Sequence, residues 1–267
     1  MSEFRADLHT HTTCSDGALT PFELIDECVK VGLSGLSITD HDTIAAYTDA
    51  LFDYAKSRNV ALLTGVEFST EFQNHSVHVL GYNFDVDSQE INALTEQHRK
   101  RRLKRAHHIV ENLKREGIDL NIDELPDAAS VGRVHIAQQM VKKGIVKDLR
   151  EAFRLYLGKE GHFEPVGLEE TLEVIHKANG RAVIAHPHLL RSNRLFRLLL
   201  KCPFDGVEGH YARFVKRQEK PFVQAAKERG LLVTGGSDFH GPFKPHSPLG
   251  CSWVDQPTFN QLLSRDA

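Results

Sequence analysis

The 267-residue sequence contains little cysteine, no long apolar run and no strong charge imbalance. Its four cysteines show no paired spacing, which favours reduced thiols and a cytoplasmic protein. No apolar stretch approaches the roughly 18 residues of a membrane span and the sequence does not begin with a signal-peptide pattern, so we expect no membrane partner. A formal net charge of −3 argues against binding of long duplex nucleic acid but is compatible with a small phosphorylated substrate.

Histidine, by contrast, is abundant, with sixteen copies. His9 and His11 lie two positions apart in a short extended run, so both side chains point to the same face of a strand. Asp16 follows in a Ser-Asp-Gly turn that can bring its carboxylate back over the strand end. Two imidazoles and a carboxylate at one strand end are typical of a divalent-metal site, although an isolated pair of histidines also occurs on protein surfaces.

Predicted strands alternate with helices along most of the chain. The strands cover residues 4–11, 33–40, 60–66, 76–84, 181–185, 204–207 and 231–234. Helices of about ten to fifteen residues between strands are typical of βαβ units and a parallel sheet. Nearly every predicted strand ends in His, Asp or Glu, and parallel α/β barrels build their active sites at the C-terminal strand ends. The pattern therefore predicts an α/β barrel with a metal site at that end.

A helical stretch interrupts this alternation. A long helix is predicted over about residues 88–116, followed by shorter helices over 133–143 and 148–157. We expect residues 85–163 to form a helical insertion subdomain, with the barrel made by residues 1–84 and 164–267. The basic run 99–105 on the long helix is either a solvated face or a local surface that attracts RNA ends.

Six motifs follow one another along the chain. They are His9-x-His11-x4-Asp16-Gly17, Thr39-Asp40-His41-Asp42-Thr43, Gly65-Val66-Glu67-Phe68-Ser69, Val77-His78-Val79-Leu80-Gly81-Tyr82, Ala185-His186-Pro187 and Gly236-Ser237-Asp238-Phe239-His240-Gly241. In this order they resemble the polymerase-and-histidinol-phosphatase (PHP) family of metal-dependent phosphoesterases. The resemblance implies a distorted (β/α)7 TIM-like barrel with a trinuclear metal centre, often loaded with manganese.

A motif in the insertion resembles one branch of this family in particular. Its run Gly132-Arg133-Val134-His135-Ile136-Ala137 resembles the branch that acts on nucleoside 3′,5′-bisphosphates and on short RNA 5′ ends. Two departures affect the choice of substrate: Val134 stands where that branch usually has proline, and His188 stands where glycine is common. The implied partners are a small phosphorylated nucleotide or a short RNA.

The same resemblance implies nine metal ligands and their grouping. His9, His11, Glu67 and Asp238 would hold a first ion, Asp16 and His41 a second with Glu67 bridging, and His78, His186 and His240 a third. Glu67 and Asp238 would also be catalytic. Candidate substrate contacts are Arg133, His135, Arg191 and Lys159. His210, at a predicted strand end, is a candidate acid for the leaving group.

The charges of this set favour phosphate chemistry. Three divalent ions against three carboxylates would leave the site about +3, which attracts a phosphate dianion. Nitrogen and oxygen ligands without cysteine suit Mn, Fe or Zn. The hypothesis is hydrolysis by a metal-activated hydroxide, without a serine or cysteine nucleophile.

Three other functions stay open at this stage. A histidinol-phosphate or other small phosphomonoester phosphatase would use similar ligands. A metal-dependent amidohydrolase also begins with an H-x-H pair at a strand end, but the lysine ligand that it usually has is not evident in this sequence. A non-catalytic metal-binding regulatory domain would be expected to have an incomplete ligand set, and no gap is visible here.

Overall fold

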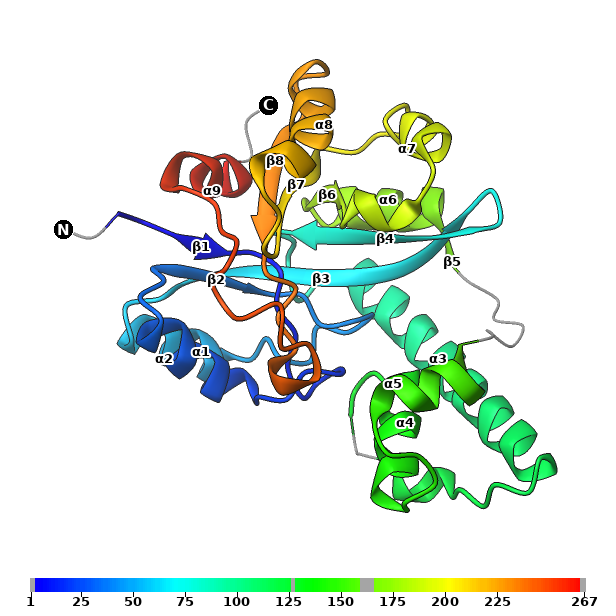
Figure 1. The fold of residues 1–267 in the computed structure, drawn as a ribbon. Coiled ribbons are helices and arrows are strands. Elements are labelled where there is room, and N and C mark those ends of the chain that lie inside the picture. Colours follow the sequence, from blue (N-terminus) through cyan, green and yellow to red (C-terminus); the bar gives the residue numbers. More distant parts are fainter. Residues whose placement is uncertain (1–2, 126–127, 159–165, 265–267) are drawn as a thin grey trace.

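A single mixed sheet forms the centre of the protein (Figure 1). The computed structural model describes residues 3–125, 128–158 and 166–264. The sheet order is β1-β2-β3-β4-β6-β7-β8, and β5 pairs with β3. The strands are β1 (Ala6–Asp7), β2 (Gly35–Ile38), β3 (Ala61–Phe72), β4 (His75–Tyr82), β5 (Val166–Gly167), β6 (Arg181–Ile184), β7 (Gly206–Tyr211) and β8 (Leu232–Gly236). Leu8 N–H donates to Gly235 O at 3.3 Å, so the sheet is nearly closed into a barrel, as the sequence predicts.

Helices cover the outside of this sheet and form the insertion. They are α1 (Pro21–Lys30), α2 (Asp49–Ser57), α3 (Gln89–Arg115), α4 (Arg133–Lys142), α5 (Leu149–Ala152), α6 (Leu168–Lys177), α7 (Asn193–Leu199), α8 (Lys216–Lys227) and α9 (Gln256–Leu263). Short helical turns lie at η1 (Ile122–Glu124), η2 (Phe153–Leu157, a π-helix), η3 (Pro187–Leu190) and η4 (Gly241–Phe243). No helix in the described residues combines the length and apolarity that crossing a membrane requires.

One strand departs from the predicted parallel sheet. β4 runs antiparallel to both β3 and β6, and His78 lies opposite Ser69 of β3. Because β4 is reversed, residues near its start lie beside the C-terminal half of β3. His78 therefore reaches the same end of the barrel as the residues that follow the parallel strands.

Local sequence signals explain several helix boundaries. Thr20 and Glu23 form a capping box at the start of α1, and Ser88 caps α3, which spans nearly the predicted length. Helix α2 begins at Asp49 because the Thr48 side chain caps it by accepting the Leu51 N–H. The helix predicted over 148–157 is divided into α5 and the π-helix η2.

The insertion has a hydrophobic cluster of its own. Buried side chains of α3, α4 and the turns around them pack together, including Ala106, Val110, Ile136, Met140 and Leu157. Figure 1 shows these helices to one side of the sheet. The cluster agrees with an insertion between β4 and β5, while its exact limits at 85 and 163 stay a prediction because residues 159–165 lie outside the described chain.

Candidate metal centre

The nine predicted ligands converge at one end of the barrel. Groups able to hold a metal ion are His11/Asp16/His41/His240, His9/Glu67/His186, His9/His11/Asp238 and His41/Glu67/His78, with ligand atoms within 4.8 Å of one another in each group. These residues come from the loops after β1, β2 and β6, from strands β3 and β4, and from the segment after β8. The barrel therefore brings together side chains that are far apart along the chain.

Glu67 lies at the middle of the cluster and is 1% exposed. Five imidazoles contact its carboxylate, those of His9, His11, His41, His78 and His186. The shortest contacts are 2.6 Å from Oε1 to His78 Nδ1 and 2.7 Å from Oε1 to His186 Nε2. The other three rings contact Oε2 at 3.1–3.2 Å. One carboxylate thus spans two sets of nitrogen ligands, which suits a bridging ligand.

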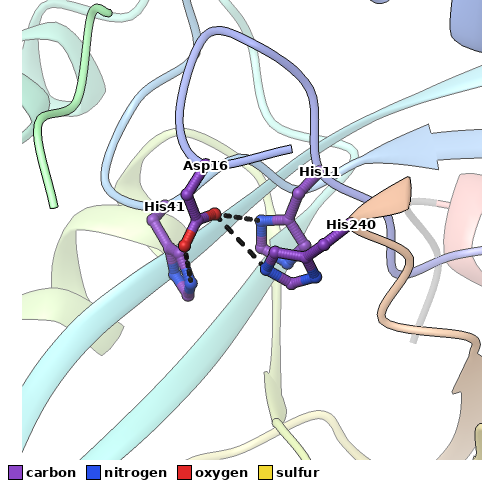
Figure 2. A group of neighbouring side chains, drawn as sticks. All are labelled: His11, Asp16, His41 and His240. Carbon is purple, nitrogen blue, oxygen red and sulfur yellow. Dashed lines mark ion pairs between the residues drawn. The ribbon is translucent and has the colours of Figure 1, made fainter. Parts of the chain in front are cut away.

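Asp16 is the carboxylate of a second group, shown in Figure 2. Its Oδ1 atom lies 3.3 Å from His240 Nε2 and 3.8 Å from His11 Nδ1, and its Oδ2 atom lies 3.8 Å from His41 Nε2. These distances place His240 with Asp16 and His41. They favour a grouping different from the one implied by the resemblance, which put His240 with His78 and His186.

Asp238 uses its two oxygens for different purposes. Oδ1 faces the cluster, 3.5 Å from His11 Nε2 and 3.3 Å from His240 Nδ1. Oδ2 accepts a hydrogen bond from the Tyr211 hydroxyl at 2.6 Å and pairs with the Lys244 ammonium. The second oxygen thus anchors the side chain, so that the first is free to serve as a ligand.

Two residues of the centre have unusual backbone conformations. Asp238 has φ 54° and His186 has φ 23°, values that residues other than glycine seldom adopt. The His186 N–H donates to Glu208 Oε2 at 2.6 Å, which helps to hold this strained turn. Such strain is tolerated when the surrounding contacts over-determine the position, and it occurs often at functional sites.

Burial and close charges act against each other in this centre. Burial works to raise the pKa of Glu67, but the adjacent imidazoles hold the pKa well below its ordinary value, so the carboxylate stays ionised. Burial lowers the pKa of His41 to about 3, which keeps its ring neutral. His11 behaves differently, because the carboxylates of Asp238 and Glu67 outweigh burial and raise its pKa to about 9. Metal ligands require an ionised carboxylate and a neutral imidazole, so Glu67 and His41 already have that state, whereas His11 would release its proton to bind a metal.

Three buried ring nitrogens of the centre lack hydrogen-bond partners in the part of the chain that the structure describes, which bears on whether a metal fits there. His11 Nδ1, His11 Nε2 and His41 Nδ1 are buried and have no hydrogen-bond partner among the described residues. Buried polar atoms are rarely left without partners in folded proteins. These unpaired nitrogens lie close to carboxylate oxygens. Their arrangement fits metal ligands better than it fits members of a hydrogen-bond network.

Four residues outside the predicted ligand set support this centre. Glu208 Oε1 lies 2.8 Å from His9 Nδ1, so it orients that ring. Asp7 accepts the backbone N–H groups of Ser237 and Gly250 at 2.9 Å and so ties the segment after β8 to β1. Tyr211 and Lys244 hold Asp238. Asp7 lies at the end of β1, a signal that could have identified it, but nothing in the sequence near Lys244 indicates that it pairs with Asp238.

Two of the four expected substrate contacts lie beside the centre. Arg133 lines a cavity of about 290 Å³ together with Arg102 and Arg105, and Asp16, His41 and His78 form its metal-side wall. His135 is buried, its Nδ1 accepts the Gly132 N–H at 2.9 Å, and it interacts electrostatically with Asp16. Arg191 is exposed on the turn after β6 and does not line this cavity. Lys159 lies outside the described residues.

His210 does not face the centre, so the structure does not support its predicted catalytic role. Its Nδ1 lies 3.0 Å from Glu219 Oε2 of α8, on the outer side of β7. The register shows why, because Glu208 pairs with Thr234 whereas His210 pairs with Gly235, with a bulge between them. The extra residue reverses the alternation of side chains, so Glu208 points inward and His210 outward.

Comparison with known proteins identifies the family. The PHP domain model matches residues 7–180. The chain belongs to the PHP domain family. This PHP protein is 32% identical over 262 residues to the 5′-3′ exoribonuclease Rnm of Escherichia coli (strain K12), covering 93% of this chain and 87% of that protein. It is 33% identical to the 3′,5′-nucleoside bisphosphate phosphatase of Chromobacterium violaceum, covering 88% of this chain and 87% of the relative.

Solved structures agree with this assignment. A provisionally assigned metal-dependent phosphoesterase from Bifidobacterium adolescentis has a TM-score of 0.87 and 29% identity, and the match covers 98% of this chain and 96% of that chain. The resemblance read from the motifs is thus confirmed, as is the TIM-like barrel. This PHP protein is a phosphoester hydrolase of a metal-dependent family.

We expect Glu208→Gln to weaken divalent-metal binding by about 10- to 100-fold, because the amide holds His9 and the His186 turn less firmly. The check is activity as a function of Mn²⁺ concentration, with full activity recovered at high metal. Glu219→Gln alters the comparable contact with His210 on the outer face and should leave the metal dependence unchanged. Identical metal dependence in both variants would refute the positioning role of Glu208.

Proposed function

We propose that this PHP protein hydrolyses nucleoside 3′,5′-bisphosphates or short 5′-phosphorylated oligoribonucleotides. The observation that carries the proposal is a cluster of nine metal-type ligands adjoining a cavity lined by three arginines. Relatives named as an exoribonuclease and as a bisphosphate phosphatase, at 32% and 33% identity over most of the chain, support the same two substrate classes. The four cysteines are all free, in keeping with a reducing compartment such as the cytoplasm.

The centre would hold three divalent ions, with Mn²⁺ preferred over Fe or Zn. The distances support three ligand sets, namely His9/His11/Asp238 with Glu67, Glu67 with His78/His186, and Asp16 with His41/His240. Imidazole and carboxylate ligands without cysteine suit these metals. When bound, such ions neutralise phosphate charge and activate water for attack on phosphorus.

The protein's own side chains would bind and orient the substrate. Arg102 is fixed by Asp42 and Ser69, at 2.6 Å and 3.0 Å, and Arg133 donates to Leu157 O at 3.1 Å, so both guanidinium groups are held at the wall of the cavity. Guanidinium groups bind phosphate oxygens with charge-assisted hydrogen bonds. We propose that one phosphate lies at the metal centre while a second lies against these arginines.

The test compares four substrates with the manganese-loaded protein. They are adenosine 3′,5′-bisphosphate, a 5′-phosphorylated trinucleotide, histidinol phosphate and a dihydropyrimidine. We expect the highest kcat/KM for one of the first two. A preference for histidinol phosphate would favour the small-phosphatase alternative, a preference for the dihydropyrimidine would favour an amidohydrolase, and no turnover would favour a non-catalytic metal-binding domain. Any of these outcomes would overturn the proposal.

Arg133→Ala should raise KM for adenosine 3′,5′-bisphosphate by about 10-fold or more, since a hydrogen bond to a charged group contributes roughly 1.5–3 kcal/mol. Hydrolysis of a simple monophosphate without a second phosphate should change little. Steady-state kinetics on both substrates provide the check. Arg150→Ala, at an exposed position of α5, is the matched control. An equal loss on both substrates would argue against recognition of a second phosphate by Arg133.

A further inference from the structure

A groove lies on the outer wall of the barrel, away from the metal centre. It has a volume of about 890 Å³, and its walls are α8 on one side and residues 251–258 on the other. Figure 1 shows α8 and α9 flanking β7 and β8. Val233 of β8 and the outward His210 of β7 also line it. The bulge that turns His210 away from the metal centre thus directs it into this groove.

Among the described residues, three cationic side chains line the groove without making contacts that stabilise the fold. Arg213, Lys216 and Lys227 line it, and none of their three side chains makes an ion pair or hydrogen bond with any residue in 3–125, 128–158 or 166–264. Its two carboxylates are engaged, because Glu219 contacts His210 at 3.0 Å and Asp255 accepts the Thr258 N–H at 3.0 Å. The groove therefore offers positive charge to an anionic ligand even though the whole chain has a net charge of −3.

Aromatic rings lie among these cations. Trp253 and Phe214 both line the groove, and the Arg5 guanidinium lies 5.9 Å from the centre of the indole ring. Cations interleaved with aromatic rings are the chemistry that binds single-stranded nucleic acid, in which each base offers a face for stacking and each linkage a charge.

The groove is also connected to the metal centre. Phe214 packs against Tyr211 with ring centres 5.5 Å apart, and the Tyr211 hydroxyl donates to Asp238 at 2.6 Å. The loop after β7 thus contributes to the groove through Ala212, Arg213 and Phe214. This loop therefore lies between the metal centre and the groove.

We propose that this groove binds the single-stranded RNA that continues beyond the nucleotide at the metal centre. The inference rests on the proposed function, because it takes a short oligoribonucleotide as the substrate. The groove would make affinity depend on oligonucleotide length, whereas a nucleoside bisphosphate would occupy the centre alone.

Trp253 allows the binding to be measured without catalysis. It is the only tryptophan in the sequence and it lines the groove, so its fluorescence reports occupancy there. The groove variant carries Arg213→Glu, Lys216→Glu and Lys227→Glu. The matched control carries Lys56→Glu, Lys114→Glu and Lys201→Glu, the same charge change at exposed positions elsewhere. Metal-free protein is titrated with 5′-phosphorylated pentaribonucleotide and with adenosine 3′,5′-bisphosphate at several salt concentrations.

We expect the pentaribonucleotide to quench the fluorescence and the groove variant to lose about 10-fold or more in affinity, with a salt slope lower by about 2, since each phosphate contact contributes roughly 0.7. Turnover of adenosine 3′,5′-bisphosphate by the metal-loaded groove variant should stay within about twofold of wild type. Unchanged affinity, an equal loss in the control, or equal quenching by the bisphosphate would overturn the inference. Failure of the wild-type protein to hydrolyse either substrate would instead overturn the proposed function, while the titration would still report on the groove.

Discussion

Glu67→Gln should abolish phosphoester hydrolysis, lowering kcat by at least about 10³-fold, because several kcal/mol of transition-state stabilisation depend on the metals that this carboxylate holds. Glu67 is 1% exposed and its two oxygens contact five imidazoles. The amide removes the negative charge at the middle of the cluster and places an NH₂ group against ring nitrogens. The measurement is kcat at saturating Mn²⁺, together with the bound metal determined by mass spectrometry.

The control for this variant is Glu173→Gln, whose side chain is 64% exposed on α6. It should match the wild-type protein in activity and metal content. Circular dichroism separates a loss of ligation from a loss of folding. A folded Glu67→Gln protein with wild-type kcat would contradict both the bridging role of Glu67 and the proposed metal chemistry.

Arg102→Ala should lower the free energy of unfolding by about 3–5 kcal/mol, which is large for a single substitution. Arg102 lies on α3 of the insertion and is bonded to Asp42, which is fully buried, at 2.6 Å. Removing the guanidinium leaves a buried carboxylate without its main counter-charge. Urea unfolding at neutral pH measures the loss.

The pH dependence of this effect has a definite sign. Burial acts to raise the pKa of Asp42, but Arg102 and His98 hold it below the ordinary value of 3.8. The stabilisation is therefore complete above that value and is lost as the pH falls through the lower folded-state pKa. The difference in stability between Arg102→Ala and wild type should shrink on acidification.

A matched arginine on the same helix distinguishes this buried pair from a surface pair. Arg99 pairs with Glu96, and both side chains are more than 40% exposed. Arg99→Ala should change the free energy of unfolding by no more than about 1 kcal/mol. The double variant Asp42→Asn/Arg102→Ala should be less destabilised than Arg102→Ala, since no unpaired charge is then buried. Equal stability of the two arginine variants would refute the argument.

The basic run 99–105, which contains Arg99 and Arg102, could not be assigned a role from the sequence alone. Charge patterning alone left a solvated face and an RNA-attracting surface open. The structure divides the run, because Arg99 and Lys100 pair with Glu96 at the surface, whereas Arg102 and Arg105 line the cavity beside the metal centre. Which side of a helix meets the barrel depends on how the insertion packs, and no spacing within α3 specifies it.

The sequence by itself determined the α/β barrel and the helical insertion, because strand and helix periodicity are local properties of the chain. Its motifs gave the side chains of the candidate centre through their resemblance to the PHP family. Only the tertiary structure decided that β4 is reversed, that His240 lies with Asp16 and His41, and that His210 faces outward. It also supplied Lys244 as the partner of Asp238. Strand direction, a bulge and contacts between distant loops arise from packing and pairing across the barrel, which no local pattern in the sequence encodes.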